Sequence, residues 1–385
     1  MSQQQKFAGF ILKQVEARPL FSIFITALVL RFGLLALGFV DYWGDAHHNL
    51  IMSKLTLDNN WLYTDFKDRQ YTWLPWYRYW GALVMWLTGT YSLFVMNVVN
   101  SVIGAITALL GGWFTLKLAD LKTALWAGFA IALMPYLMIF SYVNMGEMQG
   151  GLLLLLWVIG VSRKNFWVVA ISALLAALTR YELIFLVAIA LIPLWVMNQR
   201  KAVYFSIGGL GLALTLWSIW AWVNSGNPLN WLLMRIDSTT QSSGFYAEDA
   251  NTLFRFVFLP LAAILQAFPL VIFFIWFKKK GSMLNRKFTP QYLMGFLIIS
   301  HLVFFLVAQT KIMAYPDTRF FVISLPIATI WFMLLLRGGY FRPFVRPRIV
   351  FFLLGLSLLQ LIVPFYRQYS LQPRKEVGEW MAKNL

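Results

Sequence analysis

The chain alternates long apolar runs with short polar loops. Hydropathy predicts eleven membrane spans, at 20–40, 91–116, 123–140, 149–162, 166–178, 182–197, 202–223, 257–277, 291–309, 320–336 and 349–365. A run of about 18 or more apolar residues can cross a hydrocarbon core of ~30 Å as a helix, because a helix satisfies its own backbone hydrogen bonds. The pattern therefore predicts an all-α polytopic membrane protein, with residues 1–385 forming one transmembrane domain.

The loops between these spans differ in charge on the two sides of the membrane. One set carries 18 of the 32 basic residues but only Glu16 and Asp120 among the 15 acidic ones, which is typical of cytoplasmic loops. This places the N-terminus in the cytoplasm, and places the C-terminus and the outer loops 41–90 and 224–256 on the other side. We expect a bacterial inner membrane protein whose first outer loop contains interfacial helices.

Composition excludes some classes of function. The chain is 60% hydrophobic and 12% charged, with a formal net charge of +17 and no cysteine. A nucleic-acid-binding protein would gather its basic residues on one face, whereas here they are spread over many short loops, so we expect no nucleic-acid partner. The lack of cysteine excludes disulfides and cysteine metal sites.

The first outer loop holds the most suggestive polar cluster, GDAHHN. A helix starting at the end of the first span would place Asp41 and Asp45 on one face, with His47 and His48 close by. Such a group can act as a general base or hold a divalent cation, in which case Asp45 and His48 are the expected ligands. Helix capping or simple solvation of the aspartates is the competing interpretation.

The same loop continues into an aromatic segment, WLPWYRYW, which includes Tyr77. Trp and Tyr gather at membrane interfaces whatever the function, so this strip also fits an interfacial helix without a ligand. Arg69 nearby could neutralise a lipid phosphate.

Other polar groups on the outer side lie at span ends. Glu147 lies between two apolar spans, and Arg180 and Glu182 belong to the TRYE run that separates two others. Lys311 and Arg319 belong to the late segment KIMAYPDTRFF; a cation that snorkels to the interface is the alternative interpretation for Arg319. An arginine near membrane depth is well suited to an anionic lipid phosphate.

The layout of GDAHHN and WLPWYRYW after the first span, TRYE in mid-chain and a late PDTRFF resembles the GT-C superfamily of membrane glycosyltransferases. It is most similar to the branch with protein O-mannosyltransferases and lipid A aminoarabinose transferases. The resemblance covers the topology of most of the chain and rests on short motifs. It implies inverting transfer of a sugar from a polyprenyl-phosphate donor to an acceptor hydroxyl, on a glycan, lipid or protein, at the non-cytoplasmic face.

In that scheme Asp45 is the expected catalytic base, with Asp41 as its close competitor. The expected phosphate ligands are Arg180, Arg319, Arg69 and Lys311. The expected groups that position sugar or acceptor are His47, His48, Glu147, Tyr181, Glu182 and Tyr77. Many members of the family carry two adjacent acidic residues where this chain has Asp45 followed by Ala46, which leaves any metal requirement open.

Two other classes of function compete with the transferase. A lipid or solute transporter, such as a flippase, predicts charges near the bilayer midplane and a pathway to both faces. Most ionisable groups here lie instead at outer span ends, with Arg31 the chief exception. A noncatalytic scaffold or receptor is the third interpretation.

Overall fold

A computed structural model of the chain describes residues 18–38, 41, 44–62, 74–233, 289–311 and 318–337. Every regular element in these ranges is helical, as the sequence predicts. The predicted spans 257–277 and 349–365, and most of the outer loop 224–256, lie outside the described residues. The count of eleven spans therefore stays a prediction.

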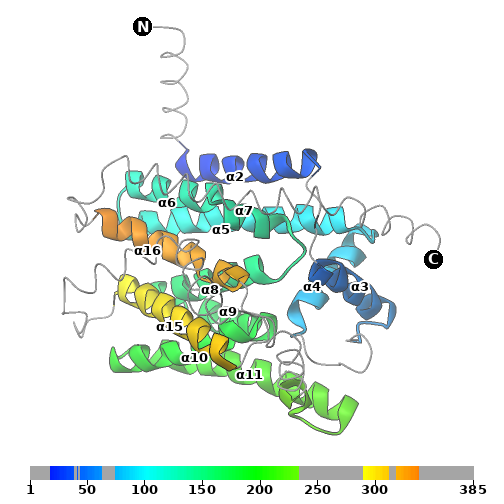
Figure 1. Cartoon of the computed structure of the whole chain (residues 1–385). Coiled ribbons are helices and arrows are strands. Elements are labelled where there is room, and N and C mark those ends of the chain that lie inside the picture. The colour runs from blue at the N-terminus through cyan, green and yellow to red at the C-terminus, as the bar shows by residue number, and fades with distance from the viewer. Residues whose placement is uncertain are drawn as a thin grey trace.

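Most of the described helices run roughly alongside one another, and α3 and α4 lie together at one end of the bundle (Figure 1). The elements are α2 (Pro19–Ala36), α3 (Gly44–Asp58), α4 (Trp76–Thr88), α5 (Leu93–Leu118), α6 (Leu121–Leu133), α7 (Pro135–Tyr142), α8 (Glu147–Arg163), α9 (Phe166–Thr179), α10 (Tyr181–Val196), α11 (Arg200–Ser225), α15 (Pro290–Lys311), the 3-10 helix η2 (Thr318–Ile323) and α16 (Leu325–Arg337).

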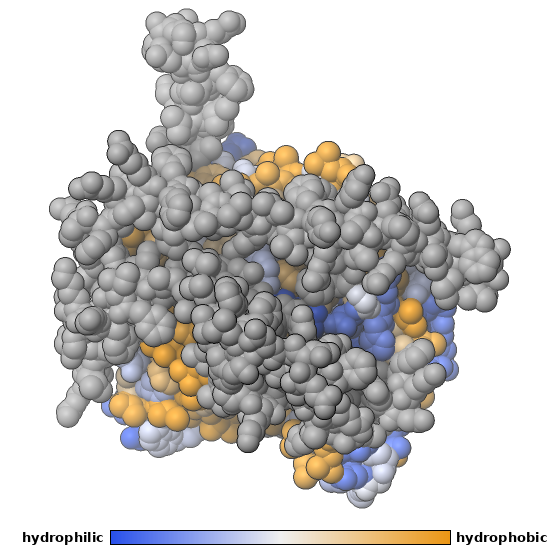
Figure 2. Space-filling view, in the orientation of Figure 1, coloured by the Kyte–Doolittle hydropathy of each residue, from blue (hydrophilic) through white to orange (hydrophobic). Residues whose placement is uncertain are grey.

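The outward faces of the bundle are apolar. The helices α2, α5 and α11 are long and apolar enough to cross a membrane, and α6 with α7 makes a fourth if that bent pair is one span. Large apolar side chains such as Val29, Trp167 and Trp222 are more than half exposed on these faces. Figure 2 shows apolar surface (orange) in several places around the molecule. Because water would penalise so much exposed apolar surface, the chain is an integral membrane protein.

The predicted span 123–140 is wrong as a single helix, because α6 and α7 meet at a 55° bend. Pro135 has no backbone N–H and disfavours helical geometry at Met134, whose ψ is 118°. Arg31 of α2 lies against this break. Its Nη1 donates to the carbonyl of Ala132 at 3.1 Å, and its Nε donates to Ser141 Oγ at 2.6 Å. The charge inside the first predicted span, Arg31, thus stabilises the broken helix. This gives a structural explanation for the charge that most favoured a transporter.

Small residues allow α9 and α11 to pack closely. A Cβ built on Gly209 of α11 would lie 2.3 Å from the backbone oxygen of Ala170 in α9, a distance that real Cβ atoms do not adopt. Gly208, one residue earlier, faces outward with nothing within 4 Å of such a Cβ. On the same helix, Ser206 Oγ accepts a hydrogen bond from the buried indole of Trp157 in α8 at 3.0 Å. The contact at Gly209 therefore fixes how closely α11 approaches α9.

This packing predicts opposite effects for two neighbouring substitutions. Gly209→Ala forces the helices apart and lowers the free energy of unfolding by about 1–3 kcal/mol, the usual cost of overpacking. Gly208→Ala leaves the packing unchanged and raises helix propensity, so it stabilises by up to about 1 kcal/mol. Thermal unfolding of both purified variants in the same detergent measures the difference. Equal shifts for the two variants would show that the α9–α11 contact is looser than described.

Candidate active site

A small cavity lies where the ends of α3, α4, α8, α9, α10 and η2 meet, with a volume of about 60 Å³. Three acidic residues line it, and each lies in the first turn of a helix: Asp45 in α3, Glu147 in α8 and Glu182 in α10. The positive end of a helix dipole favours a carboxylate at that place. Two arginines complete the set: Arg180, between α9 and α10, and Arg319 of η2.

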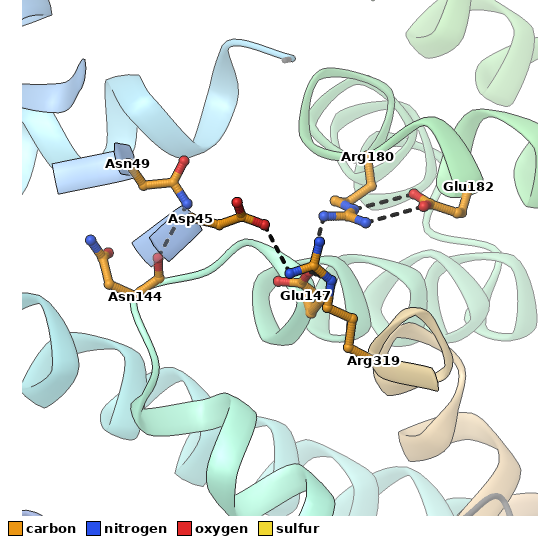
Figure 3. Close-up of polar contacts among 7 residues, drawn as sticks. All are labelled: Asp45, Asn49, Asn144, Glu147, Arg180, Glu182 and Arg319. Atoms are coloured by element: carbon orange, nitrogen blue, oxygen red, sulfur yellow. Dashed lines mark hydrogen bonds and ion pairs between the residues drawn. The ribbon is translucent and has the colours of Figure 1, made fainter. Parts of the chain in front are cut away.

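These five side chains form one chain of ion pairs (Figure 3). Arg180 holds Glu182 with two hydrogen bonds, from Nη2 at 3.1 Å and from Nε at 3.2 Å. Its Nη1 donates to Glu147 Oε1 at 3.0 Å. The guanidinium of Arg319 donates from Nη1 to Asp45 Oδ2 at 2.9 Å, and its Nε lies 3.7 Å from Glu147 Oε1. One oxygen of Glu147 therefore brings both guanidinium groups together.

Burial divides this set into an inner and an outer part. The side chain of Glu147 is fully buried and that of Glu182 is 4% exposed, whereas that of Asp45 is 36% exposed. Burial is the largest single influence on the pKa of Arg180 and lowers it, but Glu182 and Glu147 together raise that pKa above its usual value. Arg180 therefore stays charged, as a buried cation between two acidic partners should.

The ring of Phe320 supports both arginines. The guanidinium carbon of Arg180 lies 5.1 Å from the ring centroid, and that of Arg319 lies 5.4 Å from it. Both distances fall within the range of favourable cation–π contact. The aromatic ring and Glu147 thus hold two positive groups side by side at the cavity wall, an arrangement that suits a phosphate with oxygens to share between them.

Asn144, in the turn between α7 and α8, ties the first outer loop to the turn that leads into Glu147. Its backbone N–H donates to Asp41 Oδ2 at 2.6 Å, and its side-chain Nδ2 donates to the carbonyl of Ala46 at 2.8 Å. Its own carbonyl accepts a hydrogen bond from Asn49 Nδ2 at 3.2 Å. All three bonds are buried and join segments about a hundred residues apart. They fix the start of α3 relative to the start of α8.

Tyr77 of α4 extends this set of bonds to α5. Its hydroxyl donates to Asn144 Oδ1 at 2.8 Å and accepts from Asn100 Nδ2 at 2.7 Å, while Asn100 also donates to the carbonyl of Val143 at 2.9 Å. Burial raises the pKa of Tyr77 well above its usual value, so the hydroxyl keeps the proton that it donates. We call Asp41, Asn49, Tyr77, Asn100 and Asn144 the polar frame.

The structure brings together most of the residues that the sequence singled out. Asp45, Glu147, Arg180, Glu182 and Arg319 form the ion-pair chain, and Tyr77 and Tyr181 also line the cavity. Arg69 lies outside the described residues. Lys311 is the last residue of α15, and its side chain lies outside the described part of the structure.

Asp41 differs from the prediction. The helix α3 begins at Gly44, so Asp41 precedes it and the two aspartates do not share a helix face. Asp41 is 1% exposed and binds the backbone of Asn144. A carboxylate that caps a turn in this way satisfies a buried N–H, and this supports a structural role for Asp41.

The two histidines of the first loop are not among the residues that line the cavity. His47 Nε2 is 3.1 Å from the carbonyl oxygen of Asp41. His48 Nε2 is 3.0 Å from Nη2 of Arg78, a buried arginine of α4 that lines the cavity. An arginine N–H can only donate, so this geometry makes Nε2 of His48 an acceptor. Among the described residues, no group of three or more His, Asp or Glu side chains is arranged to hold a metal ion.

Some site residues were missed or underrated at the level of sequence. Asn100 lies inside an apolar span, where a buried amide is costly unless it is hydrogen-bonded, and this signal could have marked it. Phe320 carried no such signal, because its role depends on two arginines that the fold brings to its ring.

Comparisons with known proteins bear on the fold. No protein-family model and no curated protein sequence matches the chain. The apo crystal structure of the Archaeoglobus fulgidus oligosaccharyltransferase aligns with 91% of this chain at 12% identity, with a TM-score of 0.52. This likeness shows the fold. The shared fold agrees with the helical membrane fold that the sequence resemblance implies, while membership of the GT-C superfamily and the branch within it stay predictions.

Two other structures of the same archaeal protein also align. Its complex with Zn and sulfate matches 91% of this chain at 15% identity with a TM-score of 0.49, and its complex with an inhibitory peptide and a dolichol-phosphate matches 93% at 14% with 0.46. The chain spans about half the length of these solved proteins, from 52% to 56%.

The polar frame predicts that Tyr77 and Asn144 act together. Tyr77→Phe and Asn144→Ala each leave buried polar groups without a partner and lower the free energy of unfolding by about 1–3 kcal/mol. Because both remove the same hydrogen bond, the double variant loses less than the sum, with a coupling of at least about 0.5 kcal/mol. Unfolding of the four proteins in mixed micelles measures this coupling.

A distant pair provides the control. Tyr77→Phe combined with Ser206→Ala, which removes the acceptor of the Trp157 indole, is additive within about 0.5 kcal/mol. If Tyr77 and Asn144 are equally additive, the bond between them does not contribute to the folded state.

Proposed function

We propose that this protein is an inverting glycosyltransferase that moves a sugar from a polyprenyl-phosphate donor to an acceptor hydroxyl on the non-cytoplasmic face of the membrane. One observation carries the proposal: a partly exposed carboxylate, that of Asp45, lines the same cavity as the guanidinium groups of Arg180 and Arg319, which share the buried acid Glu147. A base beside paired cations is what transfer from a phosphate leaving group requires. The fold shared with the archaeal oligosaccharyltransferase adds support.

The reaction follows from this arrangement. The carboxylate of Asp45 takes the proton of the acceptor hydroxyl while the acceptor oxygen forms a bond to the anomeric carbon. The bond from that carbon to the donor phosphate oxygen breaks, and its electron pair leaves with the polyprenyl phosphate. Attack opposite the leaving group inverts the anomeric centre. Arg180 and Arg319 stabilise the charge that develops on the departing phosphate.

A donor dissolved in the membrane suits this site. A lipid phosphate contains its own activated leaving group and reaches an outer-face cavity sideways from the bilayer, so the transfer needs no nucleotide-binding fold. Tyr181 and Glu182 line the cavity, and we expect them to position sugar or acceptor; His48 contacts Arg78, which also lines the cavity.

The proposal predicts the effect of removing the base. Asp45→Asn keeps the shape of the side chain but takes no proton, so kcat falls by a factor of about 10²–10⁴. The assay measures release of polyprenyl phosphate from a panel of labelled polyprenyl-phosphate hexoses and pentoses by the purified protein in lipid nanodiscs, with glycan, lipid and peptide acceptors.

Asp58→Asn is the matched control. Asp58 lies at the other end of the same helix, with an exposed side chain that pairs with Lys54. This variant should keep wild-type turnover. The assignment of the base fails if Asp45→Asn is as active as Asp58→Asn, and the transferase function fails if wild-type protein releases no polyprenyl phosphate from any donor.

A further inference from the structure

The two arginines of the ion-pair chain contact acidic groups of different burial. Arg180 makes three hydrogen bonds to two buried carboxylates, Glu147 and Glu182. Arg319 donates to the partly exposed carboxylate of Asp45 at 2.9 Å and makes a longer contact of 3.7 Å to Glu147. Figure 3 shows Arg319 reaching from η2 into the space between these two acids.

The partners of Arg319 also differ in how easily they give it up. Breaking a buried pair leaves a charge without compensation, and this is strongly unfavourable. A carboxylate that is 36% exposed, like that of Asp45, is compensated by water when its partner leaves. The bond between Arg319 and Asp45 is therefore the one in this chain that can exchange, while Arg180 stays fixed.

The small volume of the cavity also points to Asp45 as the group that exchanges. A cavity of about 60 Å³ holds only a few water molecules, so a phosphate reaches the arginines by displacing a group already bound to them. The carboxylate of Asp45 is the acidic group nearest to water. A phosphate and a carboxylate offer a guanidinium the same kind of oxygen pair, so they compete for it directly.

We propose that Asp45 and the donor phosphate compete for Arg319, so that donor binding draws Arg319 away and leaves the Asp45 carboxylate open to the acceptor hydroxyl. This inference rests on the proposed transferase function. Without donor, Oδ2 of Asp45 accepts a bond from Arg319. With donor, that oxygen is available for the acceptor proton. The donor then binds before the acceptor in productive turnover.

The test measures donor binding in the absence of transfer. Polyprenyl monophosphate, the leaving group itself, is titrated into the full-length protein in nanodiscs of neutral phospholipid, and the dissociation constant is read by calorimetry. Asp45→Asn removes the competing charge and keeps the side-chain shape, so it binds the probe roughly twofold to fivefold more tightly than wild type, the range that a partly exposed ion pair accounts for. Asp58→Asn binds like wild type.

A double variant isolates the role of Arg319. Arg319→Gln weakens binding of the probe, and adding Asp45→Asn to Arg319→Gln then gives no gain, because the shared group is gone. If Asp45→Asn does not fold, Asp45→Ser makes the same comparison. Equal or weaker binding by the Asp45 variants would overturn the competition, and so would an equal gain with phosphatidylglycerol as probe, because Arg319 would then be binding bilayer phospholipid.

The outcomes separate the inference from the function on which it rests. Wild-type protein that transfers sugar and binds the probe, with no gain in Asp45→Asn, contradicts only the competition. Wild-type protein that neither transfers sugar nor binds polyprenyl monophosphate contradicts both.

Discussion

The site depends on one buried carboxylate, that of Glu147, which must be compensated because water does not reach it. Its Oε1 contacts the guanidinium groups of both Arg180 and Arg319, so each arginine is placed by the need to neutralise the same acid. Arg180 in turn compensates Glu182, and Arg319 extends the chain to Asp45. Two cations that would repel each other in isolation are thereby held at one wall of the cavity, where both also contact the Phe320 ring.

That arrangement requires the first turns of the helices that carry the acids to keep their relative positions. The hydrogen bonds of the polar frame fix the start of α3 relative to the start of α8. A turn between two helices exposes backbone groups that need partners, and the turn before α8 finds them in the first outer loop rather than in water. Asp41 accepts a hydrogen bond from the buried N–H of Asn144, and this supports a structural role for it rather than the role of a second base. A structural role for Asp41 leaves Asp45 as the candidate base.

The charged part of the site was predictable from the sequence, whereas the hydrogen bonds of the polar frame were not, although Asp41 and Tyr77 stood out as candidates for other roles. Glu147, Arg180 and Arg319 stand out because an ionisable residue at the end of an apolar span is costly without a purpose. Asn144 pairs with residues about a hundred positions away, and no local pattern signals such a partner. The bend at Pro135 was partly predictable. Hydropathy averaged over a window does not detect it, but a proline within an apolar run indicates a possible break. The shared helix face of Asp41 and Asp45 was wrong because α3 starts three residues later than Asp41.

The gradient of burial along the ion-pair chain gives it a direction. At the inner end, Glu182 and Glu147 cannot lose Arg180 without a large penalty, so that end is rigid. At the outer end, Asp45 is hydrated enough to change partners. A catalyst that takes a proton from one substrate and stabilises charge on another needs both properties, because its electrostatic groups must be preorganised while its base must meet an incoming hydroxyl. The ion-pair chain lies at the ends of helices, where the apolar bundle meets the loops. This position gives one cavity both a buried end and a hydrated end.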